Sequence, residues 1–241
     1  MKLAVVIAAY NEEQNIGPLT SRLVQTLRAM GTCWTLIYVI EGTDRTCEIA
    51  REFAAEHPEI RIIYNQQPSG LGGAFRHGFN AVPDDAGLVI TMDADLNHQP
   101  EEIPSLVDPV LNEGADIVIG SRRLDQSRTE GSPLWKTATS VLVSFLMQEL
   151  FNVRVKDMTS GYRVYRAELL RRIRFCNDDF AFLPEILIIA GAMGGSMVER
   201  PIHFIFRTAG VSKMRLWTTG WSYIRLFTRF ILGRRPQELY T

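Results

Sequence analysis

The stretch of residues 86–98, AGLVITMDADLNH, joins an apolar run to two closely spaced carboxylates. The run 86–91 has the length and composition of a buried strand. Residues two apart in an extended segment face the same side, so Asp93 and Asp95 can present their oxygens together where the strand ends. Such a pair suits a hard divalent cation that also binds phosphate oxygens. The simpler alternative is a turn or a helix cap, because aspartate favours both.

Three similar apolar runs precede this one, at residues 3–9, 34–40 and 60–65. Between them, helical patterns occupy residues 16–30 and about 46–56, and a further helix is expected at 74–81. Strands alternating with helices predict an α/β fold with a mostly parallel sheet flanked by helices. In such sheets, ligands bind beyond the carboxyl ends of the strands.

Polar motifs follow each of the four predicted strands. They are Tyr10-Asn11-Glu12, Glu41-Gly42-Thr43, the glycine-rich segment 69–73, and Asp93-Ala94-Asp95. We expect all four to meet at one rim of the sheet, although each alone is also compatible with a turn, a cap or a helix entry. The glycine-rich segment lacks the spacing of the dinucleotide and P-loop fingerprints, which argues against a dehydrogenase or a P-loop enzyme.

Composition is that of an ordinary globular protein: 241 residues, of which 46% are hydrophobic and 22% charged. A net charge of -1 argues against a nucleic-acid partner. Three scattered cysteines favour a reducing compartment and hence a cytoplasmic location. The apolar N-terminus is too short for a signal sequence. We expect one domain over residues 1–212.

Residues 213–241 form a basic, aromatic C-terminal arm. Between residues 213 and 235 it carries six basic residues and no acid. Its apolar side chains follow helical spacing at Trp217, Trp221, Ile224, Phe227 and Ile231. Such a stripe fits core packing or self-association, and equally a helix that lies at a membrane interface.

Taken together, these residues resemble the inverting family 2 glycosyltransferases of GT-A fold, and specifically the catalytic domains of dolichyl-phosphate or polyprenyl-phosphate mannosyltransferases. The similarity extends nearly from residue 3 to residue 213 in the family's order. It is carried by residues 9–13, 70–74, 92–98 with Pro100, 120–122, 157–165 and 199–202, followed by Arg207, Gly210, Ser212 and Lys213.

The resemblance implies a GT-A sheet that binds a nucleotide sugar, and it assigns roles to residues. The donor pocket would comprise Ala9, Tyr10, Asn11, Glu12, Glu41, Gly70, Gly72, Asp93 and Ala94. Mg²⁺ or Mn²⁺ would be held by Asp93, Asp95 and Asn97. The catalytic set would be Asp95, Arg122, Arg207 and Lys213, the three basic residues binding the acceptor phosphate.

The implied reaction is inverting transfer of a hexose, mannose above others, from a nucleotide diphosphate sugar to a polyprenyl or dolichyl phosphate. GDP-mannose is the favoured donor. A lipid phosphate is ionised near neutral pH and attacks without a protein base, so the enzyme supplies positioning and charge stabilisation. Such an acceptor implies peripheral attachment to the cytoplasmic face of a membrane, through the arm or a membrane partner subunit.

Two alternatives stay open. The same fold could transfer sugar to a saccharide hydroxyl, which requires a general base, and Asp157 and Glu185 are the candidates. The chain could also be a non-catalytic nucleotide-sugar-binding subunit, because Ile40 stands where the family usually has the first of two acids.

Overall fold

The computed structural model describes residues 1–131, 134–151, 153–206 and 216–232 of the chain. The first half alternates strands and helices as the apolar periodicity predicts. Its elements are β1 (Lys2–Tyr10), α1 (Ile16–Ala29), β2 (Trp34–Glu41), α2 (Thr46–Glu56), β3 (Ile60–Asn65), α3 (Gly70–Asn80), β4 (Ala86–Thr91), a 3₁₀ turn η1 (Pro100–Glu102) and α4 (Ile103–Asn112).

The second half departs from simple alternation and completes the sheet with shorter strands. Its elements are β5 (Ile117–Ser121), β6 (Arg128–Glu130), α5 (Leu134–Phe151), β7 (Arg163–Arg166), α6 (Ala167–Arg172), α7 (Phe182–Ala192), β8 (Met197–Pro201), β9 (His203–Ile205) and α8 (Leu216–Leu232).

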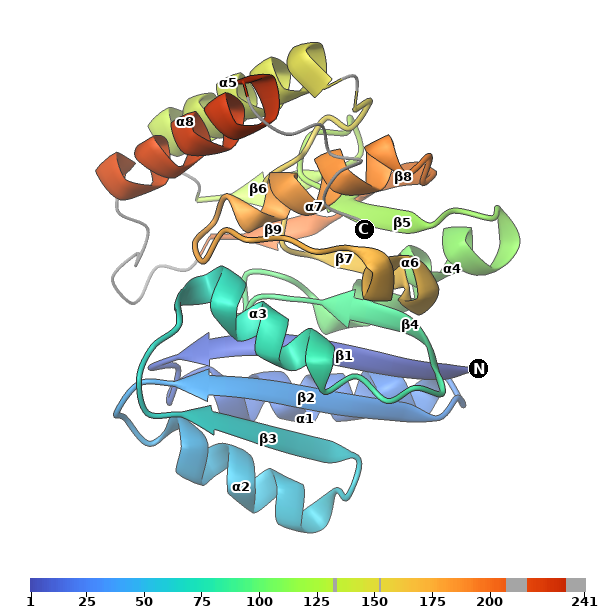
Figure 1. Ribbon diagram of the computed structural model, residues 1–241. Helices are drawn as coiled ribbons and strands as arrows, with labels where there is room; N and C mark the ends of the chain where they lie inside the picture. The colour runs from blue at the N-terminus through green and yellow to red at the C-terminus, as the bar shows by residue number, and fades with distance from the viewer. Residues whose placement is uncertain (132–133, 152, 207–215, 233–241) are drawn as a thin grey trace.

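Seven strands form one sheet in the order β3-β2-β1-β4-β7-β5-β8, and β6 pairs with β9 in a second, two-stranded sheet. Strands β1 to β4 are mutually parallel, and β5 pairs with β8 in parallel. Only β7 runs antiparallel to its neighbours in this sheet, β4 and β5. The prediction of a mostly parallel sheet flanked by helices is confirmed (Figure 1).

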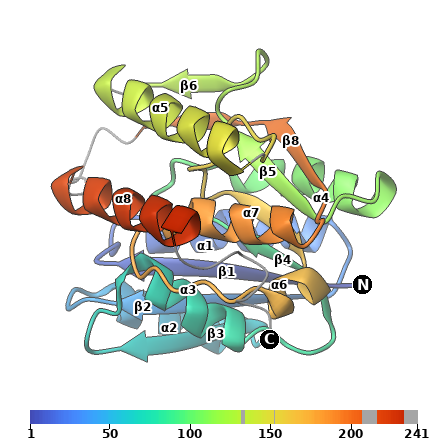
Figure 2. The ribbon, with the colours of Figure 1, turned by 45° about the horizontal axis from the view of Figure 1, so that its top comes forward.

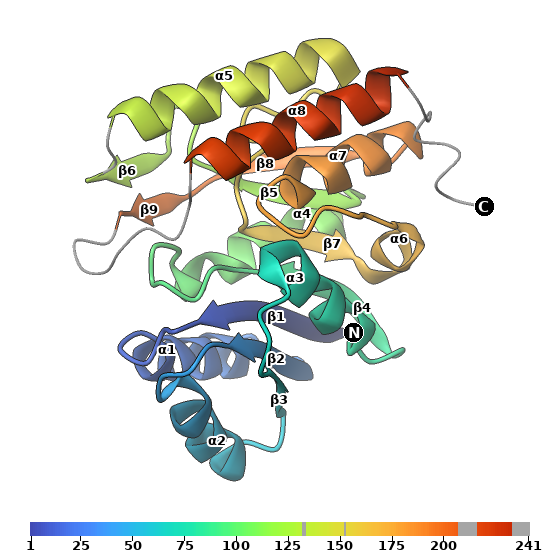
Figure 3. The same ribbon diagram turned by 60° about the vertical axis from the view of Figure 1, so that its left-hand side comes forward.

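Both faces of the sheet are apolar because both are covered. Along β1, Leu3, Val5 and Ile7 join a core shared with α1 and α4, whereas Val6 joins a second core with α3 and α7. This alternation is the period-two pattern of a strand buried on both faces. Helix α8 lies between α5 and α7 in Figure 3, and Figure 2 likewise shows α5 alongside α8.

Helix α3 begins at Gly70, four residues earlier than the predicted start at Ala74. The predicted boundary is wrong because the glycines before Ala74 are themselves helical and admit a neighbouring segment. A Cβ on Gly70 would lie 2.4 Å from the Asp178 carbonyl oxygen, and one on Gly72 would lie 2.0 Å from that of Asn177. The packing of α3 against residues 177–178 thus outweighs the low helix propensity of glycine.

The C-terminal arm contains a helix, as its spacing predicts. In α8, Leu226 and Phe230 are buried, whereas Trp221 and Ile224 are exposed. The arm therefore packs through one face and leaves part of the predicted stripe at the surface. The expected boundary between residues 212 and 213 lies outside the described residues. Within the described chain, no helix has the length and hydropathy of a membrane-spanning segment.

Candidate active site

The carboxyl ends of β1 and β2 are tied together by Asn11. Its side-chain oxygen accepts a hydrogen bond from the Thr43 backbone N–H at 2.9 Å. Asn11 adopts a positive φ of 53°, a conformation rare outside glycine. Gly42, with φ 109°, leaves no room for a side chain, because a Cβ would lie 2.1 Å from the Asn11 oxygen. Strained backbone of this kind is typical of functional sites.

The predicted donor-pocket residues are brought to this rim in different environments. Tyr10 is exposed at the end of β1, whereas Ala9 is buried behind it. Glu12 is buried, and its carboxylate accepts a hydrogen bond from the Asn15 side chain at 2.6 Å. Of these, Tyr10 offers a ring surface on which a flat base can stack.

Glu41, at the end of β2, is buried and bonded to the start of α3. Its Oε1 accepts hydrogen bonds from the Ser69 backbone N–H at 3.0 Å and the Ser69 hydroxyl at 2.6 Å, and from the Asn65 side chain at 3.2 Å. Sequence analysis placed Glu41 in the donor pocket. In the structure its carboxylate also fixes the helix entry, where an acidic group is favoured by the helix dipole.

Gly70 and Gly72 contact protein backbone. The Gly72 N–H donates to the Asp178 carbonyl at 2.8 Å. These glycines therefore fasten α3 to the segment 177–178. Their expected contact with the donor stays a prediction.

Asp93, Asp95 and Asn97 lie together immediately beyond β4. The Asp95 carboxylate accepts hydrogen bonds from the Asn97 backbone N–H at 3.2 Å and from the Asn97 side-chain amide at 2.7 Å. Between them Leu96 has a φ of 61°, a rare conformation for a bulky residue. Ala94 is buried in the core, whereas Asp93 and Asp95, which flank it in the sequence, are only half-buried.

Asp93 occupies a space that the loop before β7 keeps open. A Cβ on Gly161 would lie 2.9 Å from Asp93 Oδ1, so only glycine fits there without displacing the carboxylate. The Thr91 hydroxyl donates to the Gly161 carbonyl at 2.8 Å and fixes this approach. Asp93 keeps 39% of its side-chain surface exposed, and its Oδ2 lies 3.6 Å from His98 Nδ1.

His98, three residues after Asp95, is buried beneath the segment 93–95. It is buried between the rings of Tyr162 and Phe204, with centroids 5.0 and 5.2 Å away. Burial lowers the pKa of His98 to about 4, so the imidazole is neutral at pH 7. The negative charge of Asp93 and Asp95 is therefore not cancelled by an imidazolium.

This donor set fits Mg²⁺ or Mn²⁺. Magnesium in phosphate-transfer sites is usually held by one or two carboxylates together with substrate phosphates and water. Asp93 and Asp95 supply two carboxylates, and among the described residues no group of three or more His, Cys, Asp or Glu could by itself hold a metal ion. A cation would thus be shared between the protein and a bound diphosphate.

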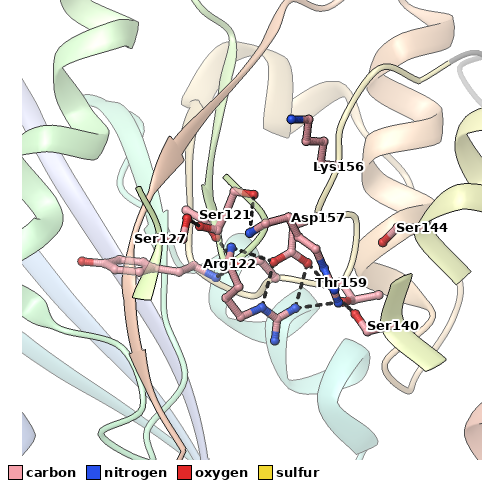
Figure 4. A network of polar contacts seen from close by, with 12 residues as sticks. Ser121, Arg122, Ser127, Ser140, Ser144, Lys156, Asp157 and Thr159 are labelled. Atoms are coloured by element: carbon pink, nitrogen blue, oxygen red, sulfur yellow. Dashed lines mark hydrogen bonds and ion pairs between the residues drawn. The ribbon is translucent and has the colours of Figure 1, made fainter. Parts of the chain in front are cut away.

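Arg122, at the end of β5, is held by a buried carboxylate. Its Nε and Nη2 each donate to Asp157 at 2.8 Å, and Nη2 also donates to the Thr159 hydroxyl at 2.9 Å (Figure 4). The guanidinium carbon lies 5.2 Å above the Phe204 ring. Burial lowers the pKa of Arg122. The charge and hydrogen bonds of Asp157, together with the charge of Asp93, raise that pKa by more, so the net shift is upward. Arg122 is a fixed cation within the field of the Asp93 carboxylate.

Sequence analysis missed the groups that orient this pair. Glu199, on β8, accepts hydrogen bonds from the backbone N–H groups of Lys156 at 2.8 Å and Asp157 at 3.0 Å. Ser140, on α5, lies 2.6 Å from the Thr159 hydroxyl. Residues 199–202 carry part of the resemblance, but nothing local shows that Glu199 or Ser140 contacts the segment 156–159, because each comes from an element distant in the sequence.

Both candidate general bases are committed elsewhere. Burial would raise the pKa of Asp157, but the Arg122 charge and hydrogen bonds hold that pKa well below its usual range. Glu185 is buried in α7 and accepts hydrogen bonds from the backbone N–H groups of Cys176 and Asn177. Its Oε1 also lies 3.4 Å from Arg229 of α8. Both carboxylates thus already have cationic and N–H partners within the protein.

The structure brings Asp93, Asp95, Asn97 and Arg122 to one region. The other two predicted catalytic residues, Arg207 and Lys213, lie outside the described residues.

Comparison with known proteins agrees with this geometry. The model of the family described as Glycosyl transferase family 2 matches residues 4–174. An undecaprenyl-phosphate mannosyltransferase of Micrococcus luteus is 31% identical over 99% of this chain and 98% of its own length. A dolichol-phosphate mannosyltransferase of Pyrococcus furiosus is 32% identical over 96% of this chain, which spans 64% of that protein. An undecaprenyl-phosphate 4-deoxy-4-formamido-L-arabinose transferase of Edwardsiella ictaluri is 32% identical over 89% of this chain and 63% of its own length.

Solved structures share the fold. Mannosyl-3-phosphoglycerate synthase from Rubrobacter xylanophilus superposes with a TM-score of 0.75 at 16% identity, covering 98% of this chain and 77% of that one. Glucosyl-3-phosphoglycerate synthase from Mycobacterium tuberculosis, in complex with Mn²⁺, uridine diphosphate and phosphoglyceric acid, gives a TM-score of 0.67 at 22% identity, covering 95% of this chain and 77% of that one. The predicted GT-A fold is confirmed.

Proposed function

The chain belongs to glycosyl transferase family 2, and we propose that it transfers a hexose, with inversion, from a nucleotide diphosphate sugar to a polyprenyl phosphate. The Micrococcus and Pyrococcus relatives, both mannosyltransferases, favour mannose and hence GDP-mannose as donor. The formamido-arabinose transferase shares the lipid phosphate acceptor but not the sugar. The acceptor class is thus better supported than the sugar.

One observation carries the choice of acceptor: Arg122 is a fixed cation beside the carboxylate rim, whereas Asp157 and Glu185 are bonded to other groups. Transfer to a hydroxyl needs a base that takes up its proton. An ionised phosphate needs no base and requires only cationic binding and alignment. The arrangement supports a phosphate acceptor over a saccharide hydroxyl.

Each residue group has a proposed part in transfer. Tyr10 and the rim at Asn11 and Glu12 bind the nucleoside. Asp93 and Asp95, with Asn97 at their side, hold Mg²⁺ or Mn²⁺ on the diphosphate. When bound, such a cation offsets the negative charge that grows on the leaving diphosphate.

On the acceptor side, Arg122 aligns the acceptor phosphate with the anomeric carbon. Arg207 and Lys213 are proposed to complete the positive charge around that phosphate. Asp157 keeps the guanidinium of Arg122 in place and does not itself accept a proton.

Thermal stabilisation followed by product analysis tests this function. The protein is heated with GDP-, UDP- and CDP-sugars, with and without Mn²⁺, and released nucleotide is then measured after polyprenyl phosphate is added. We expect Mn²⁺-dependent stabilisation by GDP-mannose and nucleotide release only with the phosphate acceptor. Binding without release would favour a non-catalytic subunit, and release with a saccharide acceptor would favour the hydroxyl reaction.

A lipid acceptor places the enzyme at a membrane. We propose a cytoplasmic protein that attaches peripherally to the membrane surface or to a membrane partner subunit, with the C-terminal arm contributing to attachment.

A further inference from the structure

Strand β9 is hydrogen-bonded to the loop that carries the proposed metal ligands. The Ile205 backbone N–H donates to the Asn97 carbonyl at 3.0 Å. Along the strand Phe204 is buried, whereas its neighbours His203 and Ile205 keep part of their surface exposed, which is the alternation of a strand with one buried face. The buried side chain of β9 is therefore turned into the protein beside the metal loop.

The ring of Phe204 contacts two groups of the site at once. Its centroid lies 5.2 Å from that of the His98 imidazole, with an angle of 64° between the ring planes. The guanidinium carbon of Arg122 stands over the same ring, also 5.2 Å from its centroid. Because His98 belongs to the loop that follows the two carboxylates, one aromatic ring connects that loop to the Arg122 cation.

The Arg122 guanidinium is held at its edge by hydrogen bonds and at its face by this ring. Nε and Nη2 donate to Asp157, and Nη2 also donates to the Thr159 hydroxyl. Such hydrogen bonds lie in the guanidinium plane, whereas an aromatic ring over the face limits movement out of that plane. Among the described residues these are all the side-chain hydrogen bonds of Arg122, so Nη1 is left to donate to a phosphate.

Strand β9 is itself fixed by neighbouring elements. Phe204 is paired in parallel with Thr129 of β6, and Figure 3 shows the two strands side by side. The His203 backbone N–H donates to a Glu102 oxygen at 2.8 Å, and His203 Nε2 lies 2.8 Å from a Glu130 oxygen. The ring of Phe204 thus sits on a strand that is anchored on both sides.

We propose that Phe204 is a positioning residue for the transfer reaction: its ring sets the distance between the metal-binding loop and the Arg122 guanidinium. This inference rests on the proposed function, in which Asp93 and Asp95 hold the cation on the diphosphate and Arg122 binds the acceptor phosphate. The ring acts by its charge distribution as well as its size, because the negative face of an aromatic ring attracts a guanidinium.

The distance between these two groups matters because both ends of the reaction depend on it. An oxygen of the acceptor phosphate forms the new bond to the anomeric carbon while the bond from that carbon to the diphosphate oxygen breaks, and the electron pair leaves with the diphosphate. A misplacement of about 1 Å between reacting groups costs about a hundredfold in rate. Loss of the ring should therefore reduce turnover far more than the binding of either substrate.

The variant Phe204→Leu removes the aromatic face and keeps an apolar side chain. Phe175→Leu is the matched control, because Phe175 is also 7% exposed and its ring also lies under an arginine, with the Arg76 guanidinium carbon 5.4 Å from its centroid. Urea denaturation should show a similar loss of stability in both variants.

Steady-state kinetics with GDP-mannose, Mn²⁺ and a short-chain, water-soluble polyprenyl phosphate then separates positioning from stability. We expect kcat to fall by about tenfold or more in Phe204→Leu, with both KM values within about threefold of those of the parent protein. The Phe175→Leu control should keep the kcat of the parent.

Fluorinated phenylalanines incorporated at position 204 test the attraction between the ring and the cation. Fluorine withdraws electron density from the ring face and weakens its attraction for a guanidinium, while the ring keeps nearly the same size. Each added fluorine, from one to three, should lower kcat further, to about one fifth of the parent value with three. A ring that only fills space would give the same kcat throughout this series.

The outcomes distinguish this inference from the proposed function. An unchanged kcat in Phe204→Leu, or an equal fall in Phe175→Leu, would overturn the positioning role, because Phe204 would then only stabilise the core. A constant kcat across the fluorinated series would overturn the electrostatic part. Absence of transfer in the parent and the control as well would refute the proposed function, and the positioning role with it.

Discussion

Replacing Asp157 with asparagine would remove a charge that the fold has buried together with Arg122. Asp157 is fully buried and Arg122 keeps 21% of its side-chain surface exposed. Removing one member of a buried pair costs about 3–5 kcal/mol, because the other charge stays desolvated. Asparagine keeps the volume and one acceptor oxygen, so we expect about 3 kcal/mol. For a domain whose total stability is of order 5–15 kcal/mol, that loss is large.

The same pair predicts a pH dependence. The folded-state pKa of Asp157 lies below that of an unfolded aspartate, which is about 3.9. Its stabilising contribution is therefore fully present above that unfolded value and is lost as pH falls through the folded-state pKa. The difference in unfolding free energy between the parent protein and Asp157→Asn should be constant from pH 7 to about pH 5 and shrink below about pH 4.

Urea denaturation at several pH values measures both quantities. With a slope of about 3 kcal/mol per molar urea, the midpoint at pH 7 should fall by about 1 M. The control is Asp85→Asn, since Asp85 is 69% exposed in its pair with Lys2 and such pairs contribute about 0–1 kcal/mol. A loss below about 1 kcal/mol in Asp157→Asn, with no change in pH dependence, would refute the assignment of this pair as the anchor of Arg122.

Three further predictions concern the rim and its cations. Asp95→Ala should abolish Mn²⁺-dependent stabilisation by GDP-mannose, and retained metal-dependent binding would contradict the metal assignment. Gly161→Ala places a Cβ 2.9 Å from Asp93 Oδ1 and should weaken metal-dependent donor binding at least tenfold, as titration calorimetry would measure; unchanged affinity would mean that Asp93 tolerates displacement. Lys213→Ala should lower turnover with polyprenyl phosphate at least tenfold while leaving donor binding intact, and steady-state kinetics showing normal turnover would remove Lys213 from the catalytic set.

Much of the rim at the carboxyl ends of β1 to β4 was predictable because it is built from local signals. Each polar motif directly follows an apolar run, and parallel strands bring their carboxyl ends to one edge. Asn11 and Glu41 illustrate the limit of that reasoning. Their position at the rim follows from the sequence, but their hydrogen bonds to Thr43 and Ser69 depend on the distance between neighbouring strand ends.

The surroundings of Arg122 were only partly predictable. Arg122 stands out as a cation after a strand, yet nothing near it in the sequence identifies Asp157 as its partner. The sequence offered Asp157 as a candidate general base, and only the fold shows that it pairs with Arg122. The start of α3 at Gly70 was missed for the same reason, since the glycines match a backbone segment about a hundred residues away.

The sequence by itself determined the strand and helix periodicity, the parallel sheet, the carboxylate pair at Asp93 and Asp95, and the family. These follow from repeating apolar patterns and short motifs, which depend on neighbours along the chain. The tertiary structure alone decided which charges neutralise one another and which face of α5 meets the solvent. Burial and ion pairing depend on distance in space, and Ser140, Thr159 and Arg122 meet only because the sheet and α5 fold against one another.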